Sequence, residues 1–250
     1  MLFRSAAVHI KVDSGMNRIG LPPGEAVAFV RRAAATAGIT CRGLYTHFAC
    51  ADGADRGPTE RQGAAFRTVV EALQSSGNRP AWVHAGNTAG ALAYPEWRWD
   101  LVRAGVGIYG LHPSAAVPLP AGFEAALEWK SRLTQIKVVP PGQGVSYGHA
   151  YVTRGEERLG TVSVGYADGF RRVDGNVVLV GGRRVPVVGR VCMDQCLVQL
   201  DTVPSAHVGD EVVLLGRQGD EAITAEEIGK RWGTINYEET CGITERVARS

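Results

Sequence analysis

Lysine is scarce in this 250-residue sequence: Lys11, Lys130, Lys137 and Lys230 are the only four. A reaction that needs a lysine amine must therefore use one of these four side chains. No low-complexity tract occurs either. A content of 45% hydrophobic and 21% charged residues is typical of a globular protein and argues against extensive disorder.

The sequence also gives no support to a membrane or nucleic-acid role. No apolar run approaches the ~20 residues that cross a bilayer, and the N-terminus lacks the pattern of a signal peptide. The 27 basic and 25 acidic residues are spread along the chain, leave a net charge of +2 and form no basic block. We therefore expect neither a membrane nor a nucleic acid as a partner.

Cysteine usage indicates a reducing compartment. The five cysteines are an odd number without the spacing of a disulfide framework, so we expect a cytoplasmic protein. Cys192 and Cys196 are separated by three residues, but no second pair with suitable histidines completes a zinc set. We therefore expect no metal site.

The first half of the chain alternates apolar runs with helical patterns. We predict strands over residues 7–12, 44–48, 81–84 and 101–109, and helices over 24–37, over 59–75 and from residue 88. This rhythm indicates a parallel sheet or barrel with its functional residues at the strand ends. Three or four strand–helix units cannot close a barrel of eight strands. We therefore expect a partial (β/α)8 barrel over residues 1–120, with further strands absent upstream.

The pattern changes after the Pro/Ala-rich residues 112–123. β-branched strands are predicted over residues 127–139, 158–164, 176–180, 184–188, 196–200 and 211–215, bounded by Gly, Asp or Pro. Many short strands with glycine-rich turns indicate a β-barrel or sandwich. A single helix is expected over residues 224–232, opened by a capping box. The fold class is thus α/β plus β, with an all-β domain over residues 121–250.

Polar residues gather at the expected strand ends of the first half. Residues 11–18 place a lysine, an aspartate and an arginine around a glycine turn, and Thr46-His47-Phe48 ends the second strand. Residues 84–88 run from strand into helix, and Arg103 begins a glycine-containing stretch. Such stretches suit an anion, because glycine lets the backbone approach a ligand and helix starts offer free N–H groups. Taken singly, however, each of these stretches has a composition that ordinary solvated loops share, and a lone histidine at a strand end is often structural.

Three glycine-rich loops stand out in the second half. Residues 142–148 present Tyr147, and residues 165–169 and 189–195 form two further loops with polar or aromatic side chains. Ordinary β-turns also combine glycine with such residues. Each loop taken alone is therefore as consistent with a plain turn as with a binding site.

The order of these motifs is more specific than any one of them. The blocks HIKVDSGMNRIG, YTHF, HAGNTAGA, RAGVGIYGLHP, GQGVSYG, VGYADGF and GRVCMDQ follow one another from His9 onward. In this order and spacing the chain resembles the alanine racemases over nearly its whole length. The resemblance implies a (β/α)8 barrel followed by a β domain, and a homodimer with active sites built across it. It also implies interconversion of L- and D-alanine with pyridoxal 5′-phosphate, which supplies D-alanine for peptidoglycan.

The resemblance assigns the proton-transfer residues. Tyr147 in VSYG matches the tyrosine that acts as base for the L-enantiomer from the partner subunit. His47 matches the histidine that links this tyrosine to Arg103, and Arg103 matches the arginine that faces the pyridine nitrogen of the cofactor. Because an arginine is always a donor, this nitrogen should stay unprotonated, which disfavours side reactions.

Substrate contacts are assigned in the same way. Arg18 matches an arginine near the phenolic oxygen of the cofactor and the substrate carboxylate. Lys11 matches a lysine that is carbamylated in some members and orients that arginine. Met193 matches a substrate-binding position contributed across the dimer, with Asp194 beside it, and Tyr166 matches the entrance to the active site.

Phosphate binding is implied for the segments that we single out for anions. Thr88, Gly105 and Val106 match the phosphate-binding positions, and Asn87 precedes Thr88 as the family pattern requires. The family commonly has serine where this chain has Thr88, and the hydroxyl is retained.

One block of the family has no counterpart in these 250 residues. Alanine racemases join the cofactor through a Schiff base to a lysine that is followed closely by a tyrosine-containing, glycine-ended loop. None of the four lysines stands in such a block. We therefore expect little or no racemase activity from this polypeptide alone. The alternatives are a truncated non-catalytic homologue that serves as a binding or dimerisation module, and a racemase for serine or another small amino acid.

Overall fold

The computed structural model describes residues 5–250. The chain divides into two compact units, residues 1–123 and residues 124–250, and each is described by itself. We call them the N-terminal unit and the C-terminal unit. Within the described range no helix is both long enough and apolar enough to cross a bilayer.

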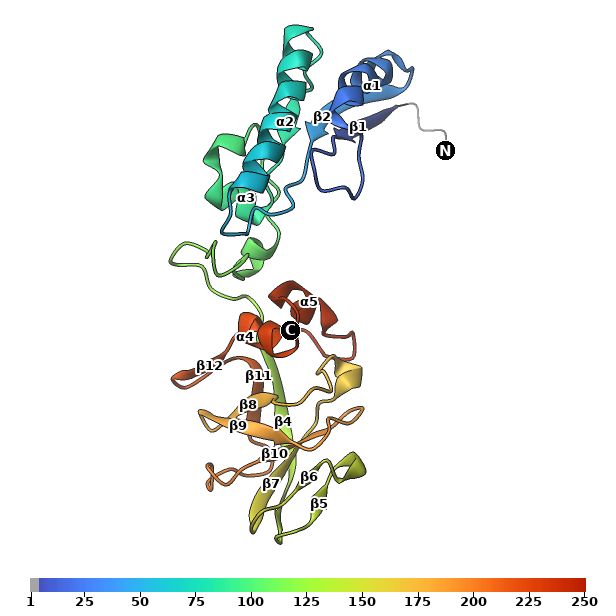
Figure 1. The fold of residues 1–250 in the computed structure, drawn as a ribbon. Helices are drawn as coiled ribbons and strands as arrows, with labels where there is room; N and C mark the ends of the chain where they lie inside the picture. Colours follow the sequence, from blue (N-terminus) through green and yellow to red (C-terminus); the bar gives the residue numbers. More distant parts are fainter. Residues whose placement is uncertain (1–4) are drawn as a thin grey trace. The chain divides into compact units, whose positions relative to one another are not determined.

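The N-terminal unit contains the predicted parallel sheet. Its strands lie in the order β1 (Ala6–Lys11), β2 (Ile39–Tyr45) and β3 (Trp82–His84). The helices α1 (Pro23–Ala35) and α2 (Gly57–Ser75) follow β1 and β2 and pack against each other (Figure 1). The short elements α3 (Thr88–Ala93), η1 (Pro95–Trp97) and η2 (Val106–Tyr109) follow β3. The βαβα rhythm of the sequence is thus confirmed in this unit.

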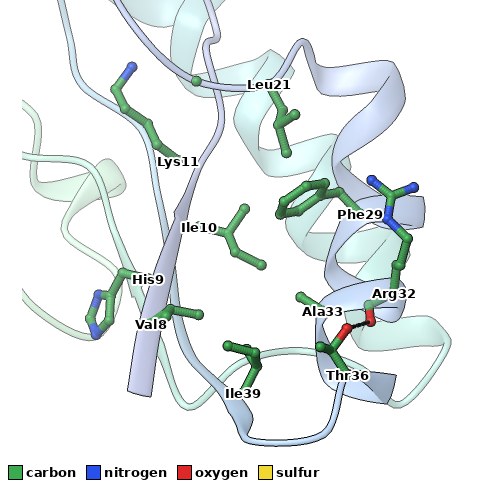
Figure 2. A pocket seen from close by; sticks show the side chains of 11 residues that line it. Val8, His9, Ile10, Lys11, Leu21, Phe29, Arg32, Ala33, Thr36 and Ile39 are labelled. Carbon is green, nitrogen blue, oxygen red and sulfur yellow. Dashed lines mark hydrogen bonds between the residues drawn. The ribbon is translucent and has the colours of Figure 1, made fainter. Parts of the chain in front are cut away.

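The two faces of β1 differ in chemistry. Because side chains alternate along a strand, Ile10 points toward α1 while His9 and Lys11 lie on the opposite side (Figure 2). Between β1 and α1 lies a cavity of ≈490 Å³ lined mainly by apolar residues, among them Ile10 and Phe29. Polar chemistry therefore belongs to the face of β1 that carries His9 and Lys11.

Two strand predictions need correction in this unit. The second strand begins at Ile39, not at residue 44, and ends at Tyr45. The strand predicted over residues 101–109 is wrong: Leu101 makes one isolated bridge to His84, and η2 follows. The Thr88 hydroxyl accepts the N–H groups of Gly105 and Gly107, which removes the donors that a β-ladder needs.

The C-terminal unit is the predicted β domain. Six antiparallel strands close into a ring in the order β11-β4-β7-β10-β9-β8, because β8 also pairs with β11. Their bounds are β4 Trp129–Val139, β7 Glu157–Val162, β8 Val177–Val180, β9 Arg183–Val188, β10 Cys196–Gln199 and β11 Glu211–Gln218. These strands confirm the six predicted ones. The sequence reading missed β12 (Glu221–Ile223) on β11 and the hairpin β5 (Gly144–Val145) and β6 (Tyr151–Val152).

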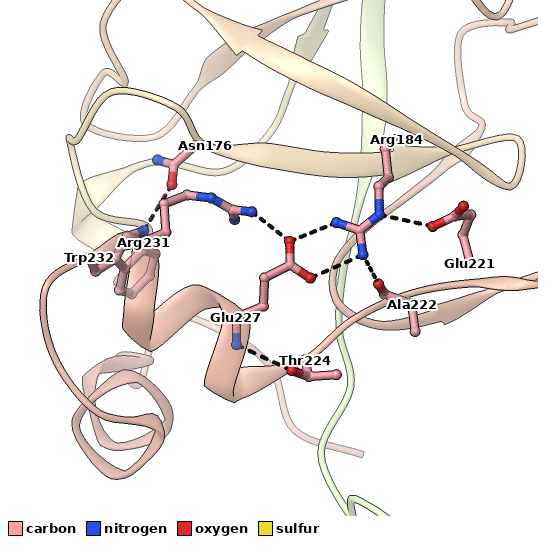
Figure 3. A network of polar contacts seen from close by, with 8 residues as sticks. All are labelled: Asn176, Arg184, Glu221, Ala222, Thr224, Glu227, Arg231 and Trp232. Carbon is pink, nitrogen blue, oxygen red and sulfur yellow. Dashed lines mark hydrogen bonds and ion pairs between the residues drawn. The ribbon is translucent and has the colours of Figure 1, made fainter. Parts of the chain in front are cut away.

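Two helices, not one, follow the barrel: α4 (Ala225–Arg231) and α5 (Asn236–Gly242), which pack together. The Thr224 hydroxyl accepts the Glu227 N–H at 3.2 Å, which confirms the predicted helix start. The Glu227 carboxylate holds Arg184 of β9 and Arg231, and Arg184 also contacts Glu221 (Figure 3). This polar network ties α4 to the barrel. Helix α5 has no side-chain cap, which leaves it without a start signal in the sequence.

Candidate active site

Arg103 is the most connected polar residue of the N-terminal unit. Its Nη2 donates to the carbonyls of Thr46 and Ala85 at 3.0 and 2.9 Å and lies 3.2 Å from Nδ1 of His47. Its Nη1 lies 2.6 Å from Nδ1 of His84. The Nε atom makes no hydrogen bond to the described part of the chain. The guanidinium is thus fixed through its two Nη atoms and keeps the Nε–H available.

His84 lies next to Arg103 at the carboxyl end of β3. Its ring is buried, stacks on Tyr45 at 5.0 Å between centroids, and places Nε2 2.8 Å from Nδ1 of His9. Burial lowers the pKa of His84 to about 4, and the positive charge of Arg103 adds to this effect. His84 therefore remains neutral at physiological pH.

His47 follows β2 and is held in place by α2. The Gln62 side chain donates to the His47 carbonyl at 3.2 Å and accepts the Ala49 N–H at 2.9 Å. Burial lowers the pKa of His47, and the charges of Arg103 and Arg18 lower it further. A neutral imidazole that accepts from Arg103 at Nδ1 carries its own proton on Nε2.

The loop after β1 is built around the Asp13 carboxylate. Its Oδ1 accepts three backbone N–H groups within residues 15–17, each at 3.0 Å, and these contacts, that of Asn17 above all, lower the pKa of Asp13. The buried Lys11 donates to the Ile19 carbonyl, and burial lowers its pKa. Arg18 is exposed and makes no hydrogen bond or ion pair with residues 5–250. This loop presents one free cationic side chain on a rigid turn.

The segment after β3 combines a buried hydroxyl with open space beside the backbone. Asn87 caps α3 by accepting the Gly90 N–H at 2.9 Å, and the buried Thr88 begins the helix. The Thr88 hydroxyl accepts the Gly105 N–H at 2.9 Å, which fixes the loop before Val106. A Cβ on Gly105 would meet no atom within 4 Å, so open space lies above this backbone.

These observations fit a pyridoxal phosphate molecule on chemical grounds. An anionic phosphate needs a hydrogen-bond donor beside open space. The Thr88 hydroxyl accepts the Gly105 N–H, keeps its own O–H to donate, and lies next to the open space at Gly105. A pyridine nitrogen needs one directed donor, which the unused Nε–H of Arg103 supplies. The residues assigned from the family pattern to the cofactor therefore have the chemistry that it requires.

Tyr147 stands on a strained turn of the C-terminal unit. It begins η3 (Tyr147–His149) and is 68% exposed, whereas Ser146 and His149 on either side adopt φ values of 65° and 47°. The Ser146 hydroxyl donates to the Arg190 carbonyl at 2.6 Å, which ties this turn to residues 189–195. Left-handed backbone at non-glycine residues costs free energy, so contacts such as that of Ser146 with Arg190 hold this turn in its conformation.

Met193 and Tyr166 lie on two loops that contact each other. The Met193 carbonyl accepts the Ala167 N–H at 2.8 Å, and the Cys192 carbonyl accepts the Tyr166 N–H at 3.0 Å. The Tyr166 turn, η4 (Tyr166–Asp168), closes when Asp168 accepts the Gly165 N–H at 2.9 Å.

Tyr147 and Tyr166 line one cavity of ≈400 Å³ in this unit. Arg172 and Val191 complete its lining, and Met193 and Asp194 are exposed nearby in sequence. The three glycine-rich loops singled out in the second half of the sequence therefore converge.

Several residues of the site were missed by the sequence reading. His84, which contacts Arg103, was not singled out, and neither were Tyr45, whose ring faces the Arg103 guanidinium, and His9, which lies behind His84. A positional signal was available for His84 alone, because it is the last residue of β3. Gln62, in the middle of α2, has no such signal.

Two family profiles match the chain. The one for the alanine racemase N-terminal domain covers residues 2–113, and the one for the alanine racemase C-terminal domain covers residues 126–250. The chain is 44% identical over 244 residues to an alanine racemase of Halothermothrix orenii and 39% identical over 252 residues to one of Methanococcus maripaludis. These alignments cover 97% and 99% of this chain, and 64% and 67% of the length of the relatives.

Solved structures agree. The alanine racemase from E. faecalis superposes with a TM-score of 0.92 at 39% identity. The superposition covers 97% of this chain and 65% of the E. faecalis chain. The alanine racemase from Bacillus anthracis with bound L-Ala-P gives a TM-score of 0.91 at 40% identity, with 97% and 64% covered. The chain thus spans slightly less than two thirds of these proteins. Both family profiles match, and the similarity at this level of identity extends over nearly the whole of this chain, so the chain belongs to the alanine racemase family.

Proposed function

We propose that these residues serve a pyridoxal-phosphate-dependent alanine racemase that interconverts L- and D-alanine and supplies D-alanine for peptidoglycan. The observation that carries this proposal is the set of contacts around Arg103, which fixes the guanidinium and leaves Nε–H free. The family membership supports the same reaction. In this proposal β1, β2 and β3 are part of a (β/α)8 barrel.

The cofactor, when bound, withdraws electrons from the α-carbon of alanine and so acidifies its α-proton. Arg103 would hold its pyridine nitrogen as a donor that does not give up its proton, which limits the electron withdrawal and disfavours side reactions. Thr88, Gly105 and Val106 would hold its phosphate, and Asn87 fixes the helix start beside them.

Inverting a stereocentre needs a proton acceptor on one face and a donor on the other. Tyr147 is the base proposed for the L-enantiomer, contributed by the partner subunit of a homodimer. His47 carries its free N–H on the nitrogen that faces away from Arg103, which suits it to hold the phenol oxygen. Arg103 and His47 would then stabilise the ionised phenol through one hydrogen-bonded chain.

The substrate is an amino acid with one carboxylate and a small side chain. Arg18, the exposed cation of the β1 loop, is proposed to bind the carboxylate, and Lys11 to hold that loop through the Ile19 carbonyl. Met193 and Asp194 are proposed to complete the substrate site across the dimer, and Tyr166 to line its entrance.

Within the 250 residues no lysine stands in the block that attaches the cofactor in this family. We therefore expect the 250-residue polypeptide to be inactive alone and to gain activity when such a block is supplied. The experiment mixes the chain with the N-terminal segment of the Halothermothrix orenii relative that precedes the aligned region, or fuses the two. D-alanine formed from L-alanine is then measured with added cofactor.

Tyr147→Phe provides the sharpest readout. In heavy water, α-hydrogen exchange of L-alanine should fall by about 10²- to 10⁴-fold, whereas exchange of D-alanine should persist because its base lies on the other face. Tyr237→Phe, an exposed tyrosine of α5 that does not line this cavity, is the matched control and should leave both exchanges within a small factor. Activity of the 250-residue chain alone that disappears in Lys11→Ala would contradict the proposal. Turnover of serine that is faster than that of alanine would favour a racemase for serine or another small amino acid. Dimerisation without any α-hydrogen exchange would favour the non-catalytic binding module.

A further inference from the structure

A further histidine, His9, lies behind His84, which is one of the two histidines that contact Arg103. Nδ1 of His84 is 2.6 Å from Nη1 of Arg103, and Nε2 of His84 is 2.8 Å from Nδ1 of His9. An arginine only donates, so Nδ1 of His84 must accept. A neutral His84 then carries its proton on Nε2 and donates it to His9, whose own proton lies on Nε2. The permanent charge of Arg103 thus orders the protons of both rings.

The fold reserves space for the His9 ring. β1 and β2 pair with a register irregularity: Val8 lies opposite Cys41, but His9 lies opposite Gly43, so Arg42 is passed over. A Cβ on Gly43 would lie 2.3 Å from Nδ1 of His9, closer than any side chain tolerates. Only glycine at residue 43 lets the ring lie flat over β2.

Competing acceptors for the His84 proton are few. The ring is buried and stacks on Tyr45 at an interplanar angle of 6°, which covers one of its faces. His9 is the partner that the structure gives to its Nε2. Without His9, a buried imidazole N–H would lose its acceptor, and His84 would gain from turning its ring or exchanging tautomers. Either change removes the acceptor that Arg103 uses at Nη1.

We propose that His9 is a positioning residue that fixes the proton of His84 on Nε2 and thereby holds Arg103 with its Nε–H directed outward. His9 itself touches neither cofactor nor substrate. The inference rests on the proposed function in one respect, namely that the Arg103 Nε–H contacts the cofactor. The positions of the protons on His84 and His9 are a property of the chain itself.

Nitrogen-15 spectra of the histidines and of the Arg103 side chain in the 250-residue protein test this proposal without cofactor. In the unaltered chain His84 should show a protonated Nε2 and an unprotonated Nδ1. In His9→Leu we expect this pattern to be lost and the Arg103 Nε–H to exchange with water about five- to tenfold faster. In His9→Asn the side-chain oxygen stands where Nδ1 was, so both signals should return toward the unaltered values.

His149→Leu is the matched control, because His149 also packs over a glycine, with its Cγ 2.3 Å from a Cβ placed on Gly144. It should leave the His84 and Arg103 signals unchanged. The proposal is overturned by a proton on Nδ1 of His84 in the unaltered chain, or by His9→Leu leaving both signals as they were. It is equally overturned by a control that shifts them as much. If His9→Leu does not fold, the unaltered chain and His9→Asn still decide.

The outcome is separable from the proposed function. If the reconstituted protein shows no racemase activity while His84 and Arg103 behave as expected, the function fails and the positioning role stands. If activity is present and His9→Leu lowers kcat without changing KM for alanine, the two are linked as proposed. Activity combined with unchanged spectra in His9→Leu rejects the positioning role alone.

Discussion

Glu239 of α5 provides a quantitative test of the packing of the C-terminal unit. Its side chain is 1% exposed, and neither carboxylate oxygen has a hydrogen-bond partner in the described part of the chain. Burial, followed by the charge of Glu226 on α4, raises the pKa of Glu239 from 4.5 to about 7. Glu226 itself is held by the Asn236 side chain at 2.9 Å, which keeps its charge nearby.

The sign of the effect on stability follows from the direction of the shift. A carboxyl whose pKa is higher in the folded chain favours folding while it is protonated, so its contribution is complete below pH 4.5 and is lost as pH rises through about 7. That interval, at ~1.4 kcal/mol for each pH unit, corresponds to about 3 kcal/mol of unfolding free energy. Glu239→Gln removes the ionisation. We therefore expect the variant to gain about 3 kcal/mol relative to the unaltered chain between pH 4 and pH 8.

The assay is urea unfolding at a series of pH values. Hydrogen exchange of peptides from β4 and β7 is the probe, so that unfolding of the C-terminal unit is observed separately. The amide of Glu239→Gln also lacks partners, but this penalty is the same at every pH and cancels in the comparison. Glu238→Gln is the matched control. Contacts with the Thr234 hydroxyl and Arg171 lower the pKa of Glu238, so its removal should act in the opposite direction. Parallel stability curves for Glu239→Gln and the unaltered chain from pH 4 to pH 8 would refute the reasoning.

Two further substitutions test the loops and the polar network of the C-terminal unit. Gly165→Ala places a Cβ 2.3 Å from the Cys192 carbonyl oxygen. We therefore expect about 1–3 kcal/mol of destabilisation in urea unfolding and loss of α-hydrogen exchange from L-alanine in the reconstituted enzyme. Unchanged stability and exchange would show that the backbone relaxes to accept the Cβ. Arg184→Leu removes the ion pairs with Glu221 and Glu227, whose side chains are partly exposed. We therefore expect the free energy of unfolding to fall by only ~1 kcal/mol, and by less in high salt. A decrease that does not depend on salt would assign the effect to packing.

Periodicity and turn residues predicted most of the fold, and the failures have specific physical causes. Among the six strands of the β barrel, β10 alternates between buried and partly buried residues, whereas β8 and β11 bury runs of three and four Val and Leu residues, and both patterns are visible in one sequence. Residues 101–109 also read as a strand, but the Thr88 hydroxyl, seventeen residues away from Gly105, takes the amide that a strand would use. A contact of this kind is set by tertiary structure and leaves no mark in local propensity.

The candidate site was predictable where it depends on strand ends. Lys11 and His84 end the two outer strands of a three-stranded parallel sheet, and His47 follows the strand between them, so the topology alone brings these positions to one edge. The contact of His9 with His84 was not predictable in this way. It depends on the register irregularity at Arg42, which no residue pattern announces.

Glycines in the signature blocks, and Gly43 just before one of them, acquire a different meaning from the structure. In the sequence they indicate turns, and Gly148 and Gly189 do have φ values of 68°. Gly43, Gly107 and Gly165 have no such backbone; each faces an atom that lies between 2.3 and 2.7 Å from a Cβ placed on it. Their neighbours are the His9 ring, the Thr88 side chain and the Cys192 carbonyl, all within the two parts of the candidate site. These glycines therefore provide space for functional side chains and loops, so alanine at these three positions should damage the site before it damages the turns.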